Sequence, residues 1–331
     1  MKIVHLWDQA NFVKNLVASP DSKSLNIEYF PKLPDFGLGR KIVNNSARIV
    51  PFAYSRLLDR YITNKSRSQA YFEFHSSPLL ERHSELIPRS ILHVHGSEVR
   101  RITGQGQIED TTTEFTRFAL QSVPLVFYST PELIEVIGKY TNRAVWIPHI
   151  SSIRYPNPSS SVTSGKLFDL VVPSSFEVWK GSQRVLDLLI ELKKSMPSLK
   201  LAGIDLGVDK ESAREIGVEL AKVSVQRKYH SLLMSSESAI GQGFGVISAA
   251  DIESIQLGLR YFPITVNTFS KSSYDFRDDD LPKPEEISTR LNLHLLNFGL
   301  RFNGFEQKVK QAHDPSAVIS RMNLAYRTYL T

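Results

Sequence analysis

Short apolar runs alternate with segments of helical periodicity along almost the whole chain. Strands buried on both faces of a parallel sheet have nearly continuous apolar runs, whereas amphipathic helices repeat apolar residues every three to four positions. In the first half, the strand-like runs are residues 2–7, 25–30, 70–74, 90–94, 125–129 and 144–148. The helices expected between them are residues 9–17, 47–62, 78–86, 112–120 and 131–140. This alternation predicts an α/β fold assembled from βαβ units.

A second series of the same kind follows a proline- and serine-rich break at residues 155–161. Its expected strands are residues 168–172, 199–203, 222–225, 239–241 and 263–266, and its expected helices are residues 182–194, 210–220 and 251–259. Because 331 residues exceed the usual size of a single core, two domains are expected. We predict an N-terminal domain over residues 1–152, a C-terminal domain over residues 165–312, and a last helix within residues 313–331 that can cross back to the first domain.

Composition excludes several classes of chemistry. Hydrophobic residues make up 41% and charged residues 22% of the chain, as in ordinary globular proteins. No apolar run approaches the roughly 20 residues of a membrane-spanning helix, and the first strand-like run is too short for a signal peptide, so we expect a cytoplasmic protein. The absence of cysteine excludes disulfides, iron–sulfur clusters, thiol catalysis and cysteine-ligated zinc.

Residues 40–67 form a locally basic segment, with seven lysines and arginines against the single acid Asp59. Aliphatic and aromatic residues lie among these cations. The segment suits a peripheral contact with the anionic inner face of a membrane or with a lipid-diphosphate acceptor. The alternative is an ordinary domain helix with a solvated charged face. No recognisable nucleic-acid-binding module accompanies it, so no nucleic-acid partner is expected.

Residues 91–98, Ile-Leu-His-Val-His-Gly-Ser-Glu, end a predicted strand in a glycine turn. Ligands of open α/β sheets bind beyond the carboxyl ends of the strands, so His95 stands where a ligand is expected. The alternative is a strand-end histidine satisfied by backbone groups. His93 and His95 share one face and could form a metal pair, but no third ligand follows at a recognisable spacing, so no metal is expected.

Two further turns suit a phosphorylated ligand. Lys180 and Gly181 lie between a predicted strand and an amphipathic helix, where the helix N-terminus and the lysine would favour a diphosphate. Residues 243–245, Gly-Phe-Gly, allow close approach of the backbone to a ligand, and Glu253 follows on the next helix. A carboxylate accepts two hydrogen bonds at once, as a ribose diol offers. The alternatives are that Lys180 is an ordinary exposed lysine, that residues 243–245 form a flexible turn, and that Glu253 is a surface glutamate.

Taken in order, these segments resemble family-four-type glycosyltransferases, also called group 1. Residues 95–100, His-Gly-Ser-Glu-Val-Arg, resemble the family's His-Gly-Ser-Asp-Val-Arg turn, and Lys180-Gly181 resembles the end of its Arg-X4-Lys-Gly segment. Residues 242–253 resemble its Glu-X7-Glu element. Ser175 stands where the family has arginine, Gln242 where it has the first glutamate, and Gln242 and Glu253 are eleven positions apart rather than eight.

This resemblance implies the GT-B fold, an α/β architecture of two Rossmann-like domains facing each other across a cleft. It implies retaining, metal-independent transfer of a hexose-type sugar from a nucleotide-diphosphate sugar to a saccharide or lipid-linked acceptor, with no further cofactor. Such transfer belongs to the synthesis of cell-surface polysaccharides or glycoconjugates.

The resemblance also assigns residues to roles. His95 would hydrogen-bond the sugar near the anomeric carbon and Lys180 would stabilise the leaving diphosphate, which makes these two the catalytic candidates. The donor-binding candidates are Gly96, Ser97, Lys180, Gly181, Gly243, Phe244, Gly245 and Glu253. Asp8 and Asn11 are the acceptor-binding candidates, in a loop that lacks the family's glycines. A nucleotide-sugar epimerase remains an alternative because it shares the fold, although it would need additional carboxylates in the cleft. A catalytically degenerate nucleotide- or sugar-binding relative is the other alternative, suggested by Ser175 and Gln242.

Overall fold

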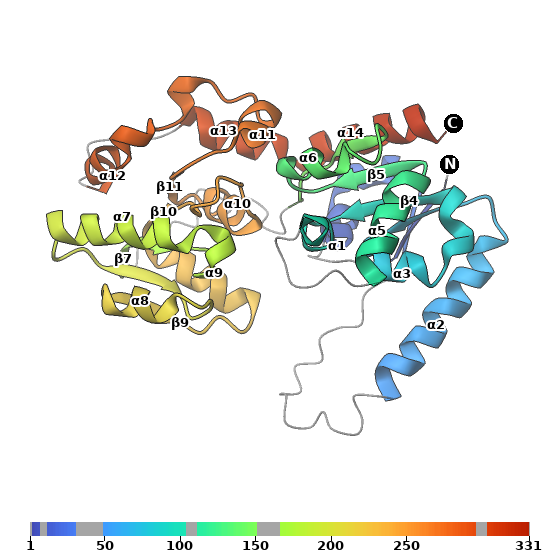
Figure 1. Ribbon diagram of the computed structural model, residues 1–331, viewed down its shortest axis with the longest axis horizontal. Coiled ribbons are helices and arrows are strands. Elements are labelled where there is room, and N and C mark those ends of the chain that lie inside the picture. The colour runs from blue at the N-terminus through green and yellow to red at the C-terminus, as the bar shows by residue number, and fades with distance from the viewer. Residues whose placement is uncertain are drawn as a thin grey trace. The chain divides into compact units, whose positions relative to one another are not determined.

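The computed structural model describes residues 2–6, 12–30, 49–103, 111–150, 166–295 and 303–330. The chain divides into two compact units, each built around one sheet (Figure 1). The N-terminal unit comprises Met1–Ser129, Leu133–Ile150 and Pro315–Thr331, and the C-terminal unit comprises Thr130–Glu132 and Ser151–Asp314. The predicted break at residues 155–161 lies outside the described residues. The predicted α/β fold with two parallel sheets is confirmed.

The N-terminal sheet has the strand order β2-β1-β3-β4-β5-β6, and all its neighbouring strands are parallel. The strands are β1 Ile3–Leu6, β2 Ile27–Phe30, β3 Tyr71–Phe74, β4 Ser90–Val94, β5 Leu125–Tyr128 and β6 Ala144–Trp146. Because β1 pairs with both β2 and β3, the direction of chain progression reverses at β1. Such a reversal is the usual ligand site of an open α/β sheet.

Helices cover both faces of this sheet. Buried residues of α1 Phe12–Ala18 and α14 Pro315–Tyr329 pack on one face. The other face packs against α2 Ile49–Ser66, α3 Ser77–Glu81, α4 Ser97–Ile102, α5 Thr111–Ser122 and α6 Ile134–Ile137. Single 3-10 turns occupy Pro20–Ser24, Ser84–Arg89 and Pro131–Leu133.

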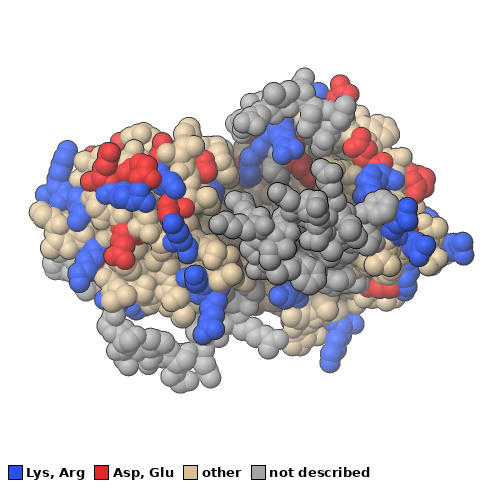
Figure 2. Space-filling view, turned by 90° about the horizontal axis from the view of Figure 1, so that it is seen from below, with Lys and Arg blue, Asp and Glu red and all other residues tan. Residues whose placement is uncertain are grey.

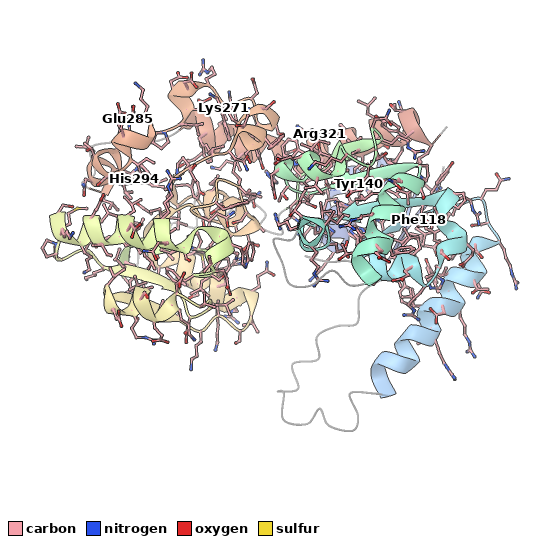
Figure 3. All side chains as sticks on the ribbon, in the orientation of Figure 1. Phe118, Tyr140, Lys271, Glu285, His294 and Arg321 are labelled. Carbon is pink, nitrogen blue, oxygen red and sulfur yellow. The ribbon has the colours of Figure 1, made fainter. Side chains whose placement is uncertain are left out.

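The last helix, α14, is part of the N-terminal unit, as Figure 1 shows in red beside β5. The Arg321 guanidinium, labelled in Figure 3, lies 4.7 Å from the centre of the Trp146 ring on β6. Tyr71 on β3 donates a hydrogen bond to the Leu330 carbonyl over 3.0 Å. Helix α14 thus packs on the sheet that contains β1, the first strand of the sequence.

The C-terminal sheet is also parallel, in the order β11-β10-β7-β8-β9, and reverses between β7 and β10. Its strands are β7 Phe168–Val172, β8 Leu201–Ile204, β9 Val218–Ala221, β10 Ser236–Ile240 and β11 Arg260–Phe262. Its helices are α7 Ser182–Ser195, α8 Lys210–Glu215, α9 Gln226–Met234, α10 Ala249–Gln256, α11 Thr268–Ser273, α12 Ile287–Leu295 and α13 Asn303–Ala312. Short 3-10 turns lie at Val178–Lys180, Asp278–Asp280 and Pro284–Glu286.

Two predicted strands of this unit were wrong. Residues 222–225 only precede α9, and the observed strand is β9, which lies just before them. Gly217 at φ +93° follows the end of α8 and leaves residues 218–221 extended. Residues 263–266 follow β11 rather than form it, since Pro263 has no N–H to donate to a neighbouring strand. The helix predicted over residues 210–220 is accordingly shorter, and α9 was not predicted.

On the face shown in Figure 2, basic and acidic side chains of the described residues are interspersed rather than gathered in one patch. Helix α2, which carries the described part of the basic segment, buries Leu58 and Ile62 in the core. Among the described residues, no helix is both long enough and apolar enough to cross a membrane.

Candidate functional site: two sheet edges

The predicted site residues follow the strands at the two reversal points. In the N-terminal unit, His95 follows β4, whose neighbour β3 pairs with β1 at the reversal. In the C-terminal unit, Lys180 follows β7 and Gly243 follows β10, the two strands between which the order reverses. Loop donors and helix N-termini converge at such positions. Each unit therefore has one candidate site at its own sheet edge.

Five titratable side chains gather on one face of the N-terminal sheet. Strand side chains alternate between faces, so His5, Glu73 and His93 share the face covered by α1 and α14. His75 and His95 continue this face beyond the strand ends. The sheet register pairs His5 directly with Glu73. The side chains of His5, Glu73, His75 and His93 are fully buried, at 0% exposure, and His95 is partly buried.

Hydrogen bonds connect Glu73 to His95 through two intermediate side chains. Because a carboxylate only accepts, His93 Nδ1 donates to Glu73 Oε1 over 2.9 Å, and His93 Nε2 shares a hydrogen bond of 3.2 Å with the Ser129 hydroxyl. The Ser129 hydroxyl shares a second hydrogen bond of 2.9 Å with His95 Nδ1, and His95 Nε2 shares one of 3.0 Å with His75 Nδ1. The tautomers of the three imidazoles decide which atom donates in each of these pairs. Both ring nitrogens of His95 are engaged within the unit.

Burial and neighbouring charges set the protonation of the cluster. Burial alone raises the pKa of Glu73, but His5, His93 and His75 lower it, and the resulting pKa lies well below its ordinary value. Burial first, and His93 second, hold the pKa of His75 and of His95 well below the usual range. At neutral pH, an ionised Glu73 therefore stands among imidazoles of which at least His75 and His95 are neutral.

Aromatic side chains close this cluster off. The Phe12 ring of α1 meets the His93 ring edge to face, with ring centres 4.7 Å apart. Tyr326 of α14 donates to Glu73 Oε2 over 2.9 Å. His149 lies beyond Phe12, and burial, aided by His93, lowers the pKa of His149 to about 4.

The other predicted residues of this edge are only partly described. Gly96 has φ +118° and forms the N-cap of α4, a backbone conformation that favours glycine. The backbone of Ser97 begins α4, but its side chain lies outside the described part, as do Asp8 and Asn11 entirely. Their predicted donor and acceptor contacts, and that of His95 with a sugar, stay predictions.

A third histidine joins the pair that the sequence suggested as metal ligands. His75, His93 and His95 form one group of potential ligand atoms within 4.8 Å of one another, and His5, Glu73 and His75 form another. The search for a third metal ligand at a recognisable spacing along the sequence missed these groups, because their members lie on adjacent strands. Alternation of Glu73 and His75 with apolar Phe72 and Phe74 was the available signal.

In the C-terminal unit, two glycine turns touch each other. Gly181 begins α7 in the left-handed region, at φ +73°. A Cβ on Gly181 would lie 2.5 Å from the carbonyl carbon of Gly243, and a Cβ on Gly243 would lie 2.2 Å from the carbonyl oxygen of Gly181. Neither position can hold a side chain without movement of backbone. The Lys-Gly and Gly-Phe-Gly turns of the sequence are thus one structural element.

Cations surround these turns. Lys180 Nζ donates to Ser175 Oγ over 2.8 Å, so the serine that replaces the family's arginine holds the lysine. Arg184 lies on the first turn of α7, where a Cβ on Gly243 would be 3.2 Å from the Arg184 Cβ. Arg184 also lines a cavity of about 340 Å³ together with Lys271 and Lys283. Lys271, labelled in Figure 3, comes from α11.

The wall of this cavity includes residues 263–266, beyond β11. The Gly-Phe-Gly loop is attached to the same segment, since Asn267 N–H donates to the Gly245 carbonyl over 2.9 Å. Gly245 itself has φ +83°. Phe244 at the tip of the loop is 40% exposed. Lys180 does not line the cavity, so the cavity and the lysine are separate features of one sheet edge.

Gln242 has a structural role that an ionised glutamate could not perform. Its side chain is buried, and Nε2 donates to the Val246 carbonyl over 2.6 Å, which closes the Gly-Phe-Gly loop. An ionised carboxylate has no proton to donate. The departure from the family pattern at this position therefore has a physical reason within the loop.

Glu253 lies in the middle of α10 rather than at its beginning. Ser248 is the N-cap of this helix, and Asp251 completes a capping box with it. Glu253 Oε2 is 3.3 Å from His230 Nε2, and Gln226 Nε2 donates to Oε1 over 3.4 Å. Burial raises the pKa of Glu253 and the nearby His230 opposes that rise. Its predicted contact with ribose stays a prediction.

Several residues of the two edges were not expected from the sequence. In the N-terminal unit these are Glu73, His75 and Ser129, and in the C-terminal unit His230 and Gln226, which belong to the unpredicted α9. No sequence signal identified His230, because its partner lies 23 residues away on another helix. Burial also raises the pKa of Glu98 to about 7, and its Oε1 accepts from the Ser77 N–H over 3.1 Å.

No protein-family model and no curated protein matches this sequence. Solved structures do match. Sucrose-phosphate synthase from Thermosynechococcus elongatus has 10% identity over 100% of this chain and 99% of its own, with a TM-score of 0.67. HepE from Anabaena, in complex with UDP and glucose, has 12% identity over 99% of both chains, with a TM-score of 0.58.

A third match is a variant of TarM from S. aureus, in complex with fondaparinux, alpha-GlcNAc-glycerol and UDP. Its identity is 8%, the match covers 78% of this chain, and the TM-score is 0.56. The chain spans 55% of the length of the TarM structure. At such identities, what is shared is the fold. The chain has the GT-B fold of these glycosyltransferases.

Proposed function

We propose that this protein is a glycosyltransferase that moves a sugar from a nucleotide-diphosphate sugar to a saccharide or lipid-linked acceptor. The observation that carries the proposal is the contact of Gly181 with Gly243 at the reversal point of a GT-B C-terminal sheet, with Lys180 and Arg184 beside it. The N-terminus of α7 and these two cations favour a diphosphate.

In the proposed reaction, cleavage of the bond between the anomeric carbon and the diphosphate builds negative charge on the leaving phosphate. Fixed cations that already face that position lower the barrier because they need no reorganisation. Lys180 is the proposed catalytic cation, and Arg184 supplies the guanidinium that Ser175 lacks. We propose retention of anomeric configuration and transfer without a metal at the diphosphate, in line with the family that the motifs resemble.

The nucleotide is proposed to bind along the C-terminal edge. UDP is bound in two of the similar structures, which makes it the first nucleotide to test. Glu253 is proposed to accept hydrogen bonds from the ribose diol, with His230 orienting the carboxylate from α9. Phe244 is proposed to lie against the sugar or the base.

The experiment is a thermal-shift series with UDP-glucose, UDP-N-acetylglucosamine and GDP-mannose on the whole chain. A donor at 100 times its Kd stabilises by about 2.7 kcal/mol, which corresponds to a rise of about 5–10 °C for units of this size. Lys180→Ala and Glu253→Ala are expected to remove most of the rise. Lys194→Ala, on the exposed face of α7, and Glu237→Ala, exposed on β10, are the matched controls.

Product analysis then separates the proposal from its rivals. Release of an epimerised free sugar without acceptor would indicate an epimerase. Nucleotide binding without transfer or donor hydrolysis would indicate a degenerate binding protein. Equal stabilisation of Lys180→Ala and the controls would show that the proposed donor site is wrong.

The proposal includes a peripheral contact of residues 40–67 with an anionic membrane surface. It is supported by exposed Leu57 and Arg60 on α2, a combination that suits a headgroup interface. Co-sedimentation with phosphatidylserine vesicles, lost in the Leu57→Ser, Arg60→Ser double variant, is the expected result. Equal sedimentation of the two proteins would contradict it.

A further inference from the structure

Three buried ligand atoms at the reversal of the N-terminal sheet form a nearly equilateral triangle. His5 Nδ1 is 3.4 Å from His75 Nε2 and 3.5 Å from Glu73 Oε1. His75 Nε2 is 3.3 Å from Glu73 Oε1. The three side chains come from two paired strands and the residue directly after one of them, and all are fully buried.

These edges are too long for charge-assisted hydrogen bonds, which measure about 2.7–2.9 Å between nitrogen and a carboxylate oxygen. They agree with the edge of a metal tetrahedron. Zinc lies about 2.0–2.1 Å from histidine nitrogen and about 2.0–2.2 Å from carboxylate oxygen, which places tetrahedral ligand atoms about 3.3–3.4 Å apart.

Each corner of the triangle can offer a lone pair to a cation. A neutral imidazole has a lone pair on the ring nitrogen that carries no proton, and a carboxylate oxygen is always an acceptor. When the proton of His75 lies on Nδ1, beside His95, the lone pair on Nε2 faces the triangle. His5, Glu73 and His75 thus offer one ligand atom each.

Surrounding groups orient two of the three ligands, His75 and Glu73, as the outer partners of a metal site do. His95 bonds to His75 Nδ1, Tyr326 donates to Glu73 Oε2, and His93 donates to Glu73 Oε1. Among the described residues, His5 Nε2 has no hydrogen-bond partner. Two imidazoles and one carboxylate are a ligand set for zinc and its neighbours in the transition series, and not for magnesium or calcium.

We propose that His5, Glu73 and His75 bind one zinc ion inside the N-terminal unit, with a fourth position for water. The ion holds β1 to β3 at the sheet reversal and balances the buried carboxylate. It is a structural site, separate from the proposed donor edge, so this inference does not depend on the proposed function.

The experiment begins with the metal content of the purified full-length chain, measured by mass spectrometry after dialysis against a weak chelator. About one zinc per chain is expected. After removal of metal with a strong chelator, added Zn²⁺ is expected to raise the Tm, and Co²⁺ is expected to give the visible absorption of a tetrahedral nitrogen–oxygen site. The cobalt spectrum needs no variant and so remains informative if variants fail to fold.

His5→Ala is expected to lower zinc affinity more than 10-fold, by removal of a ligand. His149→Ala is the matched control, because His149 lies near the cluster but outside the triangle. Absence of zinc, no thermal shift and an octahedral cobalt spectrum would overturn the proposal and leave a network of hydrogen bonds alone. Equal zinc binding by His5→Ala and His149→Ala would overturn it as well, since the metal would then lie elsewhere.

Discussion

The two sheet edges occupy the same topological position and are stabilised in opposite ways. At the N-terminal edge, β3 and β4 present imidazoles and one carboxylate, which are buried and bonded to one another. At the C-terminal edge, glycines bring two backbone turns into contact, and the cations of Lys180 and Arg184 stand beside them. The first edge is held by hydrogen bonds between buried side chains, and the second by a close backbone contact that only glycine permits.

The comparison also shows which edge suits an incoming anion. At the N-terminal edge, His75, His93 and His95 are hydrogen-bonded within the unit, so an incoming anion there competes with existing hydrogen bonds. At the C-terminal edge, the N-terminus of α7 and two cations lie beside the glycine turns and favour a phosphate. We therefore expect substitutions at the N-terminal edge to change stability first, and substitutions at the C-terminal edge to change donor binding more than stability.

The largest effect on stability is expected for Glu73→Gln. It removes the ionised acceptor of His93 and Tyr326 inside the N-terminal unit, and hydrogen bonds to a charged group contribute about 1.5–3 kcal/mol each. Urea unfolding at pH 7.5 measures the loss. Glu85→Gln, on an exposed side chain, is the control. A loss below that of typical surface substitutions would show that Glu73 is not the centre of the network.

Gly243→Ala is expected to destabilise the C-terminal unit by up to about 3 kcal/mol, because the new Cβ would meet the Gly181 carbonyl oxygen at 2.2 Å. Donor binding should fall more than 10-fold, since the turn must open. Gly258→Ala is the matched control, because Gly258 also carries positive φ (+82°) but a Cβ there meets nothing within 4 Å. Equal donor affinity in the two variants would contradict the role of the turn.

His149 in the N-terminal unit and Asp251 in the C-terminal unit should respond to pH with opposite signs. His149 has a folded-state pKa of about 4 against an ordinary 6.5, so its contribution is present above pH 6.5 and is lost as pH falls toward 4. Asp251 has a folded-state pKa of about 6 against 3.8, raised by burial, so its contribution is present below pH 3.8 and is lost as pH rises through 6.

Between pH 7.5 and pH 5, His149 is expected to lower the free energy of unfolding by about 2 kcal/mol, and Asp251 is expected to raise it by about 1 kcal/mol. Urea unfolding of His149→Gln and Asp251→Asn at both pH values measures each slope. His149→Gln should reduce the acid loss, and Asp251→Asn should increase it. The same pH dependence in wild type and either variant would show that the group concerned does not titrate as stated.

The smallest effect is expected for Gln242→Glu, about 1 kcal/mol at pH 5. A protonated glutamate can still donate to the Val246 carbonyl, whereas the ionised form cannot, so the loss should grow as pH rises. Unfolding at pH 5 and pH 8 compares the two states. A variant as stable as wild type at pH 8 would show that the amide hydrogen bond does not hold the loop.

Local patterns in the sequence were sufficient to predict the bounds of several strands and helices. The strands β4 and β7 begin and end at the predicted residues, and α7 differs from its prediction by one residue. The errors at residues 210–225 arose because Glu-Leu-Ala after Gly217 fits either a helix end or a strand, and the neighbouring β8 decides between them.

The residues of the candidate site also divide into those that local patterns predict and those that depend on the pairing of distant strands. Lys180, Gly181 and residues 243–245 could be predicted because a turn needs particular residue types in sequence. Glu73 and His75 could not be connected with His5 and His93, because their proximity depends on which strands become neighbours and in what register. Pairing of distant strands is a property of the whole sheet and has no local signature.

The position of Tyr326 has a consequence for biosynthesis. Its hydroxyl bonds to Glu73 across 253 residues of chain, and α14 covers the sheet face that carries the imidazole cluster. During translation, the first sheet is made early, but its polar face stays open to water until α14 has left the ribosome. The N-terminal half should therefore remain sensitive to proteases until α14 has been made and has packed against it.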